Sequence, residues 1–103
     1  MKDLPIYKIS YNNYNNVLIG CSLGKEVEHL LFLSRFGNDY LAVDNEQGNC
    51  VCEDFSSLEK ALCWLVRKDY SANEIRNLRL IEVRHLLNDS RYKVIEKDVI
   101  YGV

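Results

Sequence analysis

The sequence lacks a long hydrophobic run and a recognisable leader. No apolar stretch approaches the roughly 20 residues that a helix needs to span a bilayer. The N-terminal residues Met1–Pro5 also lack the long apolar run of a signal peptide. We therefore expect an intracellular, cytoplasmic protein with no membrane partner.

The short motifs that carry common chemistry are missing as well. The sequence has no Gly-x-Gly-x-x-Gly, no Walker loop, no His-Glu-x-x-His and no Gly-x-Ser-x-Gly. Adjacent carboxylates such as Glu53 and Asp54 would diverge in a strand rather than converge on a substrate. We expect no catalytic residue and no enzymatic activity. An enzyme with a reactive cysteine is the third alternative, and it predicts rapid thiol labelling near neutral pH.

The soft metal ligands are scattered along the chain. They are Cys21, Cys50, Cys52, Cys63, His29 and His85. Structural zinc sites usually contain paired Cys-x2-4-Cys or His-x3-5-His knuckles, and Cys50-x-Cys52 with isolated partners does not fit that spacing. Both histidines fall in segments that we predict to be strands. The sequence therefore predicts no metal, no cofactor and, in a reducing compartment, free thiols.

Length and composition indicate a single folded domain spanning residues 1–103. The hydrophobic and charged fractions, 48% and 27%, are close to the averages for globular proteins. The net charge of −2 gives no overall electrostatic signature of nucleic-acid binding.

The clearest local signal is a capped, amphipathic helix in the stretch 55–68. Ser56 and Glu59 have the spacing of a capping box, and Arg67 and Lys68 suit the negative end of the helix dipole. The apolar residues at helical spacing are Leu58, Ala61, Leu62, Leu65 and Val66. Such a stripe needs a surface to pack on, and the flanking strands predict that this surface is a sheet.

Most other segments predict strands. A first strand is expected at 6–9, and a second at 17–21 after a loop containing the tandem unit Tyr11–Asn16. This unit is either a surface turn or an exposed tyrosine patch. Residues 27–36 fit either a strand or a helix, and the turn at Gly37–Asp39 favours a strand. With strands at 40–43 and 50–55, this segment forms a three-stranded antiparallel meander.

Downstream of the helix, Ser71 and Glu74 predict a short helical turn over 72–77. Residues 78–84 and 92–101 are rich in β-formers and predict a C-terminal hairpin. The expected fold class is α+β: a mostly antiparallel sheet, consisting of the meander and this hairpin, with one principal helix packed on it.

Charge is distributed unevenly along the chain. The region 25–60 is mainly acidic, and the region 61–97 is mainly basic. These surfaces either keep the protein soluble and face each other within it, or present charge to a partner. The candidate partner-binding residues are Asp39, Asp44, Glu46, Glu53, Asp54 and Trp64. Trp64 lies at the edge of the helix stripe, where it either covers the core or forms a contact, because tryptophan is enriched in interface hot spots.

The basic C-terminal region supports an alternative function in nucleic-acid binding. Its candidate residues are Arg79, Arg84, Arg91, Lys93 and Lys97. Tyr92 and Tyr101 interleave with them, as in sheets that bind single strands by stacking and phosphate contacts. Glu82, Glu96 and Asp98 interrupt the patch.

The acidic meander followed by a capped helix resembles the layout of some small phage and mobile-element proteins of the anti-CRISPR type. The resemblance covers less than half of the chain and includes no diagnostic motif. It implies a non-enzymatic inhibitor that binds a host-defence protein, such as a CRISPR effector nuclease, through carboxylates that imitate DNA. The residues in that role would be Asp39, Asp44, Glu46, Glu53 and Asp54. The sequence leaves the oligomeric state open, with a homodimer as one alternative.

Overall fold

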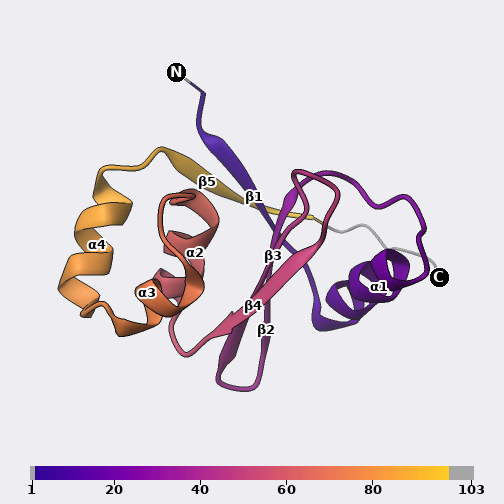
Figure 1. Ribbon diagram of the computed structural model, residues 1–103, viewed down its shortest axis with the longest axis horizontal. Helices are drawn as coiled ribbons and strands as arrows, with labels where there is room; N and C mark the ends of the chain where they lie inside the picture. The colour runs from indigo at the N-terminus through magenta and orange to yellow at the C-terminus, as the bar shows by residue number, and fades with distance from the viewer. Residues whose placement is uncertain (1, 98–103) are drawn as a thin grey trace.

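The computed structural model describes residues 2–97, in which five strands form one sheet with helices on both of its faces (Figure 1). The strands are β1 (Leu4–Lys8), β2 (Leu31–Phe36), β3 (Asp39–Asp44), β4 (Val51–Phe55) and β5 (Tyr92–Glu96). The helices are α1 (Tyr11–Ser22), α2 (Leu58–Val66), α3 (Ala72–Asn77) and α4 (Leu80–Asn88). Helix α1 covers one face, here called the α1 side, and the other helices cover the opposite face, the α2 side.

The sheet is mixed, with the strand order β4-β3-β2-β1-β5. Strands β2, β3 and β4 form the predicted antiparallel meander. Strand β1 is parallel to both of its neighbours, β2 and β5. The prediction of a mostly antiparallel sheet with one principal helix is therefore wrong. Parallel neighbours need long crossover connections. Helix α1 provides one between β1 and β2, and the segment with α2–α4 carries the chain from the β4 edge across to β5, beside β1.

The predicted C-terminal hairpin is also wrong. Strand β5 pairs with β1 along its whole length, from Leu4 opposite Tyr92 to Lys8 opposite Glu96. Its supposed hairpin partner, residues 78–84, lies mainly in helix α4. The end of the predicted last strand, residues 98–101, lies outside the described residues.

Two hydrophobic cores lie on opposite faces of the sheet, as expected when alternate strand residues point in opposite directions. The core on the α2 side includes Ile6, Leu31, Leu33, Ala42, Phe55, Ala61, Leu62, Cys63, Leu65, Ile75, Val83 and Leu87. The core on the α1 side contains Ile9, Tyr14, Val17, Val27, Phe32 and Val43. The central strands thus separate the face that α1 covers from the three-helix face.

Helix α1 occupies the segment for which a loop and a strand were predicted. Ser10 caps it, because its hydroxyl accepts a hydrogen bond from the Asn13 backbone N–H at 3.2 Å. Tyr14 and Val17, three residues apart, are buried on one face of the helix. Gly20 lets this helix approach the next loop closely, since a Cβ at that position would lie 3.1 Å from the Val27 side chain. Packing therefore overrides the weak helix propensity of asparagine here.

Helix α4 replaces the predicted strand at residues 78–84. Its buried residues, Val83 and Leu87, are spaced by four and face the core on the α2 side. The charged residues that argued against a helix point outward, and Arg84 pairs with Glu59 of α2 at 3.1 Å. The histidines were also misplaced: His85 lies in α4, and His29 lies in the loop before β2.

Helices α2 and α3 were both predicted, although the ends of α2 differ from the expectation. The residue that caps α2 is Ser57, whose hydroxyl accepts from the Lys60 backbone N–H at 3.2 Å, so the capping box proposed for the preceding serine is wrong. The helix ends at Val66, and its basic residues follow it rather than occupy its last turn. The capping box of α3 forms as predicted between Ser71 and Glu74.

Candidate functional site

The sheet divides the predicted acidic surface between its two sides. Phe55 packs in the core on the α2 side, so Glu53, two residues earlier, shares that side. Asp44 pairs in register with Val51 and also points there. By the same alternation, Asp39 and Asp54 point toward the α1 side. The five carboxylates therefore do not form one continuous surface.

On the α2 side, the carboxylates contact basic side chains of the helical region. The ammonium of Lys68 contacts the Asp44 carboxylate and lies 3.0 Å from Glu46 Oε1. Arg76 Nη2 lies 2.8 Å from Glu53 Oε1. The acidic meander and the basic region thus face each other within the molecule, which was one of the two alternatives from the sequence. Charges that are paired in this way are less available to a basic partner.

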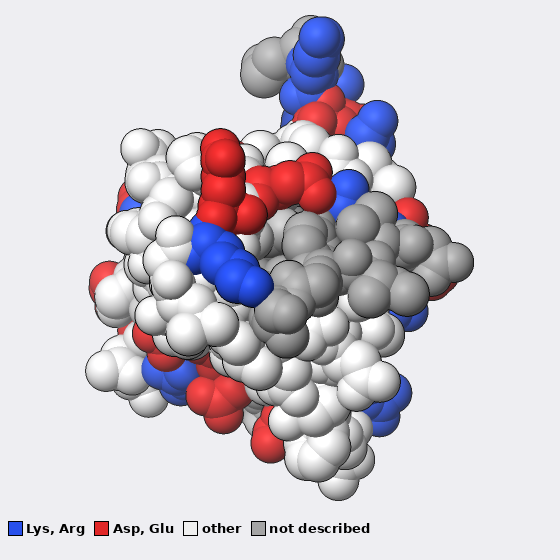
Figure 2. Space-filling model, turned by 90° about the vertical axis from the view of Figure 1, so that its right-hand side faces the viewer, with Lys and Arg blue, Asp and Glu red and all other residues white. Residues whose placement is uncertain are grey.

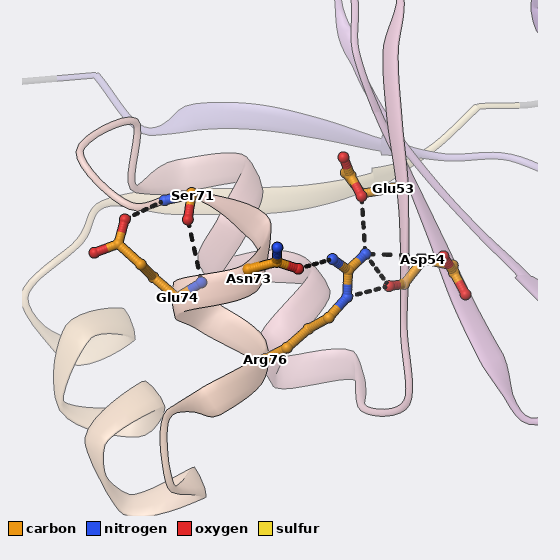
Figure 3. A network of polar contacts seen from close by, with 6 residues as sticks. All are labelled: Glu53, Asp54, Ser71, Asn73, Glu74 and Arg76. Carbon is orange, nitrogen blue, oxygen red and sulfur yellow. Dashed lines mark hydrogen bonds and ion pairs between the residues drawn. The ribbon is translucent and has the colours of Figure 1, made fainter.

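Arg76 is the centre of a polar network that joins α3 to β4 (Figure 3). Its Nη2 and Nε donate to the Asp54 carbonyl oxygen at 2.9 and 3.3 Å, and its Nη1 donates to Asn73 Oδ1 at 3.0 Å. The guanidinium also lies over the ring of Phe55, 4.9 Å from its centre. Strand β4 is an edge of the sheet. By donating to the Asp54 carbonyl oxygen, Arg76 satisfies a backbone acceptor on this edge strand. That acceptor is then not available to pair with a strand of another chain.

We expect Arg76→Ala to lower the free energy of unfolding by about 1.5 kcal/mol, because it removes several charge-assisted hydrogen bonds to one edge strand. The matched control is Arg84→Ala. Arg84 makes a single ion pair with Glu59, and its side chain is 61% exposed, so its loss should cost less than about 0.5 kcal/mol. Urea denaturation of both variants measures the difference. Equal destabilisation would show that the network contributes nothing beyond one surface ion pair.

On the α1 side, an aromatic pair extends into solvent. Phe36 is 58% exposed, and its ring stacks on that of Tyr11 with 4.3 Å between ring centres. Asp39 lies directly opposite Phe36 in the β2–β3 hairpin. Asp54 points to the same side from β4; its side chain is 70% exposed, and its Oδ1 lies 3.8 Å from Arg76 Nη2. An exposed aromatic pair is thus bordered by two carboxylates.

Helix α1 continues this surface without any charged residue. Its 12 residues include no Asp, Glu, Lys or Arg. Ile19 and Leu23, at the end of the helix, are 42% and 62% exposed. Viewed from this side, most of the described surface is uncharged (Figure 2). We define the α1 surface as Tyr11, Ile19, Leu23, Phe36, Asp39 and Asp54.

Tyr14 shows how closely α1 lies against the sheet. Its pKa is raised to about 12, first because the ring is buried and then because Cys52 and Asp54 lie near it. The phenol therefore remains neutral at physiological pH. Tyr14 belongs to the core beneath the α1 surface, whereas Tyr11 is only half-buried.

Trp64 belongs to the margin of the core. It is half-buried, packs against the core on the α2 side, and its ring centre lies 6.0 Å from that of Phe55. It therefore covers the edge of the core, and its role in partner binding stays a prediction. It also lies on the opposite side of the sheet from the exposed aromatic pair.

The basic residues proposed for nucleic-acid binding are dispersed and mostly paired. Arg79 immediately precedes α4 and Arg84 lies within it, whereas Arg91 precedes β5, Lys93 lies within it and Lys97 follows it. The ion pairs are Arg79–Glu82 at 3.1 Å, Arg84–Glu59 at 3.1 Å, Arg91–Asp3 at 3.2 Å and Lys97–Glu28 at 3.6 Å. They do not form the basic hairpin that was predicted.

Three cysteines line an open cavity of about 550 Å³ near the end of α1. They are Cys21, Cys50 and Cys52, and His29 also lines this cavity. Within residues 2–97, no group of three histidine, cysteine or acidic side chains is arranged to hold a metal ion. No helix in the same range is both long and apolar enough to cross a membrane.

No protein-family model, curated protein or solved structure matches the chain. The functional argument therefore depends on the geometry of the α1 surface. Sequence reasoning missed most of this surface, because Phe36 comes next to α1 only once residues 11–22 are helical. The one available signal was the tandem tyrosine–asparagine unit, considered as an exposed tyrosine patch.

Proposed function

We propose that this protein is a non-enzymatic inhibitor from a phage or mobile element, and that its α1 surface binds a host-defence protein, a CRISPR effector nuclease. The supporting observation is a charge-free helix beside an exposed aromatic pair. The central parts of protein–protein interfaces are depleted in charge and enriched in aromatic residues. Tyrosine, serine and asparagine, which α1 contains, are also the residues that recur in antibody binding loops.

The two carboxylates of the α1 surface indicate the chemistry of the partner. Asp39 and Asp54 add negative charge beside the aromatic pair of Tyr11 and Phe36. A complementary surface has an apolar pocket bordered by lysine or arginine. Proteins that bind nucleic acids carry such basic grooves. The acidic role proposed for five residues thus narrows to the two that lie on the α1 side of the sheet, of which Asp54 keeps only a long ion pair of 3.8 Å with Arg76.

The test is binding to purified CRISPR effector nucleases, with exposure-matched substitutions on opposite sides of the protein. We expect Phe36→Lys to raise the Kd roughly 30-fold, the effect of losing a hot-spot aromatic residue. Ile81→Lys is the control, because Ile81 lies on α4 and is 59% exposed, against 58% for Phe36. Isothermal titration calorimetry measures both affinities.

A second pair of variants separates the two sets of carboxylates. Asp54→Lys should weaken binding, whereas Glu46→Lys, on the other side of the sheet, should leave it unchanged. If Ile81→Lys and Glu46→Lys weaken binding more than Phe36→Lys and Asp54→Lys do, the partner binds the α2 side and not the α1 surface. Binding to none of the nucleases, together with a salt-dependent shift of labelled nucleic acid, would favour the alternative function.

A further inference from the structure

The cavity near the end of α1 brings together thiols that are far apart in the sequence. Cys21 lies in the last turn of α1, and Cys50 immediately precedes β4. Both line the cavity and are partly buried against the same core. Cys63 is fully buried in the core on the other side of the sheet, so it cannot reach them.

Cys50 is held in place with its thiol beside that of Cys21. The Cys21 thiol lies near enough to contribute to the raised pKa of the Cys50 thiol. The Cys50 backbone N–H donates to Asn45 Oδ1 at 3.0 Å, and Asn45 is itself buried. Cys50 also adopts a φ of 48°, the left-handed conformation that non-glycine residues rarely adopt. This backbone conformation directs its side chain differently from that of an ordinary strand residue.

We propose that Cys21 and Cys50 form a dithiol modification site, at which a small hydroperoxide that enters the cavity converts them into an intramolecular disulfide. Cys52 is the competing thiol, because it also lines the cavity and is exposed. It is two residues from Cys50, too close in an extended chain for a comfortable bridge. The inference does not depend on the function proposed above.

The reaction is balanced with hydrogen peroxide. The Cys21 thiolate attacks one peroxide oxygen, the O–O bond breaks and hydroxide leaves, so Cys21 becomes a sulfenic acid. The Cys50 sulfur then attacks the Cys21 sulfur, the S–O bond breaks, and the hydroxide leaves as water with the Cys50 proton. The two thiols lose two electrons in total, and the peroxide gains them.

The protonation states give the two cysteines different roles. Burial, followed by the neighbouring thiols of Cys21 and Cys52, raises the pKa of Cys50 to about 12. Cys50 therefore remains a thiol at neutral pH and is a poor attacking group toward peroxide. We assign the first attack to Cys21 and the second to Cys50.

The test treats the reduced full-length protein with hydrogen peroxide, blocks the remaining thiols with N-ethylmaleimide and maps the peptides under non-reducing conditions. We expect two fewer labels per molecule and a cross-linked peptide pair containing Cys21 and Cys50. Cys52→Ser and Cys63→Ser should retain the cross-link, and Cys21→Ser and Cys50→Ser should abolish it. Circular dichroism checks that each variant folds.

The disulfide should also stabilise the fold, because it closes a loop of about 30 residues. We expect the melting temperature of the oxidised protein to rise by about 10 °C and to return after reduction. A cross-link from Cys21 to Cys52 instead of Cys50 would overturn the assignment. Oxidation to sulfinic acid with no cross-link in the wild type would overturn the proposal, whatever the variants do.

Discussion

Asn45→Ala should lower the free energy of unfolding by about 3 kcal/mol, a large effect for a polar residue. Asn45 is 2% exposed, and its side chain makes three hydrogen bonds to backbone groups. Its Nδ2 donates to the carbonyl oxygens of Val27 and Glu28 at 3.2 and 2.9 Å. Its Oδ1 accepts from the Cys50 N–H at 3.0 Å. Alanine would leave these groups without the partners that compensate for their burial.

The comparison is with Asn49→Ala in the same β3–β4 connection. Asn49 is exposed, so its substitution should change the free energy of unfolding by less than about 0.5 kcal/mol. Guanidinium denaturation measures both variants. A small effect at position 45 would mean that water replaces the lost side chain. It would also weaken the inference that Asn45 positions Cys50.

The meander, α2 and α3 could be predicted because their signals are local. The turn at Gly37 adopts a φ of 63°, and Gly48 in the next connection adopts 75°, conformations that suit glycine. The capping box at Ser71 also formed as expected. These features depend on neighbouring residues, so the sequence alone contains enough information to identify them.

Helices α1 and α4 could not be predicted, because contacts from distant segments stabilise them. The asparagines of α1 favour turns in isolation, and burial of Tyr14 and Val17 against the sheet decides the outcome. The sequence of α4 places charges around a helix and so favours a strand, but in the fold α2 supplies Glu59 as a partner for Arg84. An error in either helix changes the strand pairing, because each belongs to a connection between parallel strands.

The division of the acidic site was partly predictable. Glu53 and Asp54 are adjacent, and adjacent strand residues point to opposite faces. In the sequence analysis this alternation argues that Glu53 and Asp54 do not converge on a substrate. The same alternation also predicts that the two carboxylates do not lie on one binding surface. The position of Arg76 could not be inferred, because α3 lies more than 20 residues later in the chain and reaches β4 only through the tertiary fold.

The apolar stripe of α2 allows the same substitution to be compared at two positions. From the sequence, Leu58 and Leu65 are equivalent members of the stripe. In the structure Leu65 is fully buried, whereas Leu58, in the first turn, is 40% exposed. We therefore expect Leu65→Ala to lower the free energy of unfolding by about 3 kcal/mol, the usual range for a buried leucine that leaves a cavity.

Leu58→Ala removes the same atoms from the same helix but should cost less than about 1 kcal/mol, because the exposed side chain loses less burial. Alanine also favours helices slightly more than leucine does, which reduces the cost further. Urea denaturation of both variants measures the difference. If the free energy of unfolding falls with urea concentration at the same rate in both, their unfolded states are comparable. Equal losses of stability would mean that Leu58 is buried in solution by contacts that the described residues do not make.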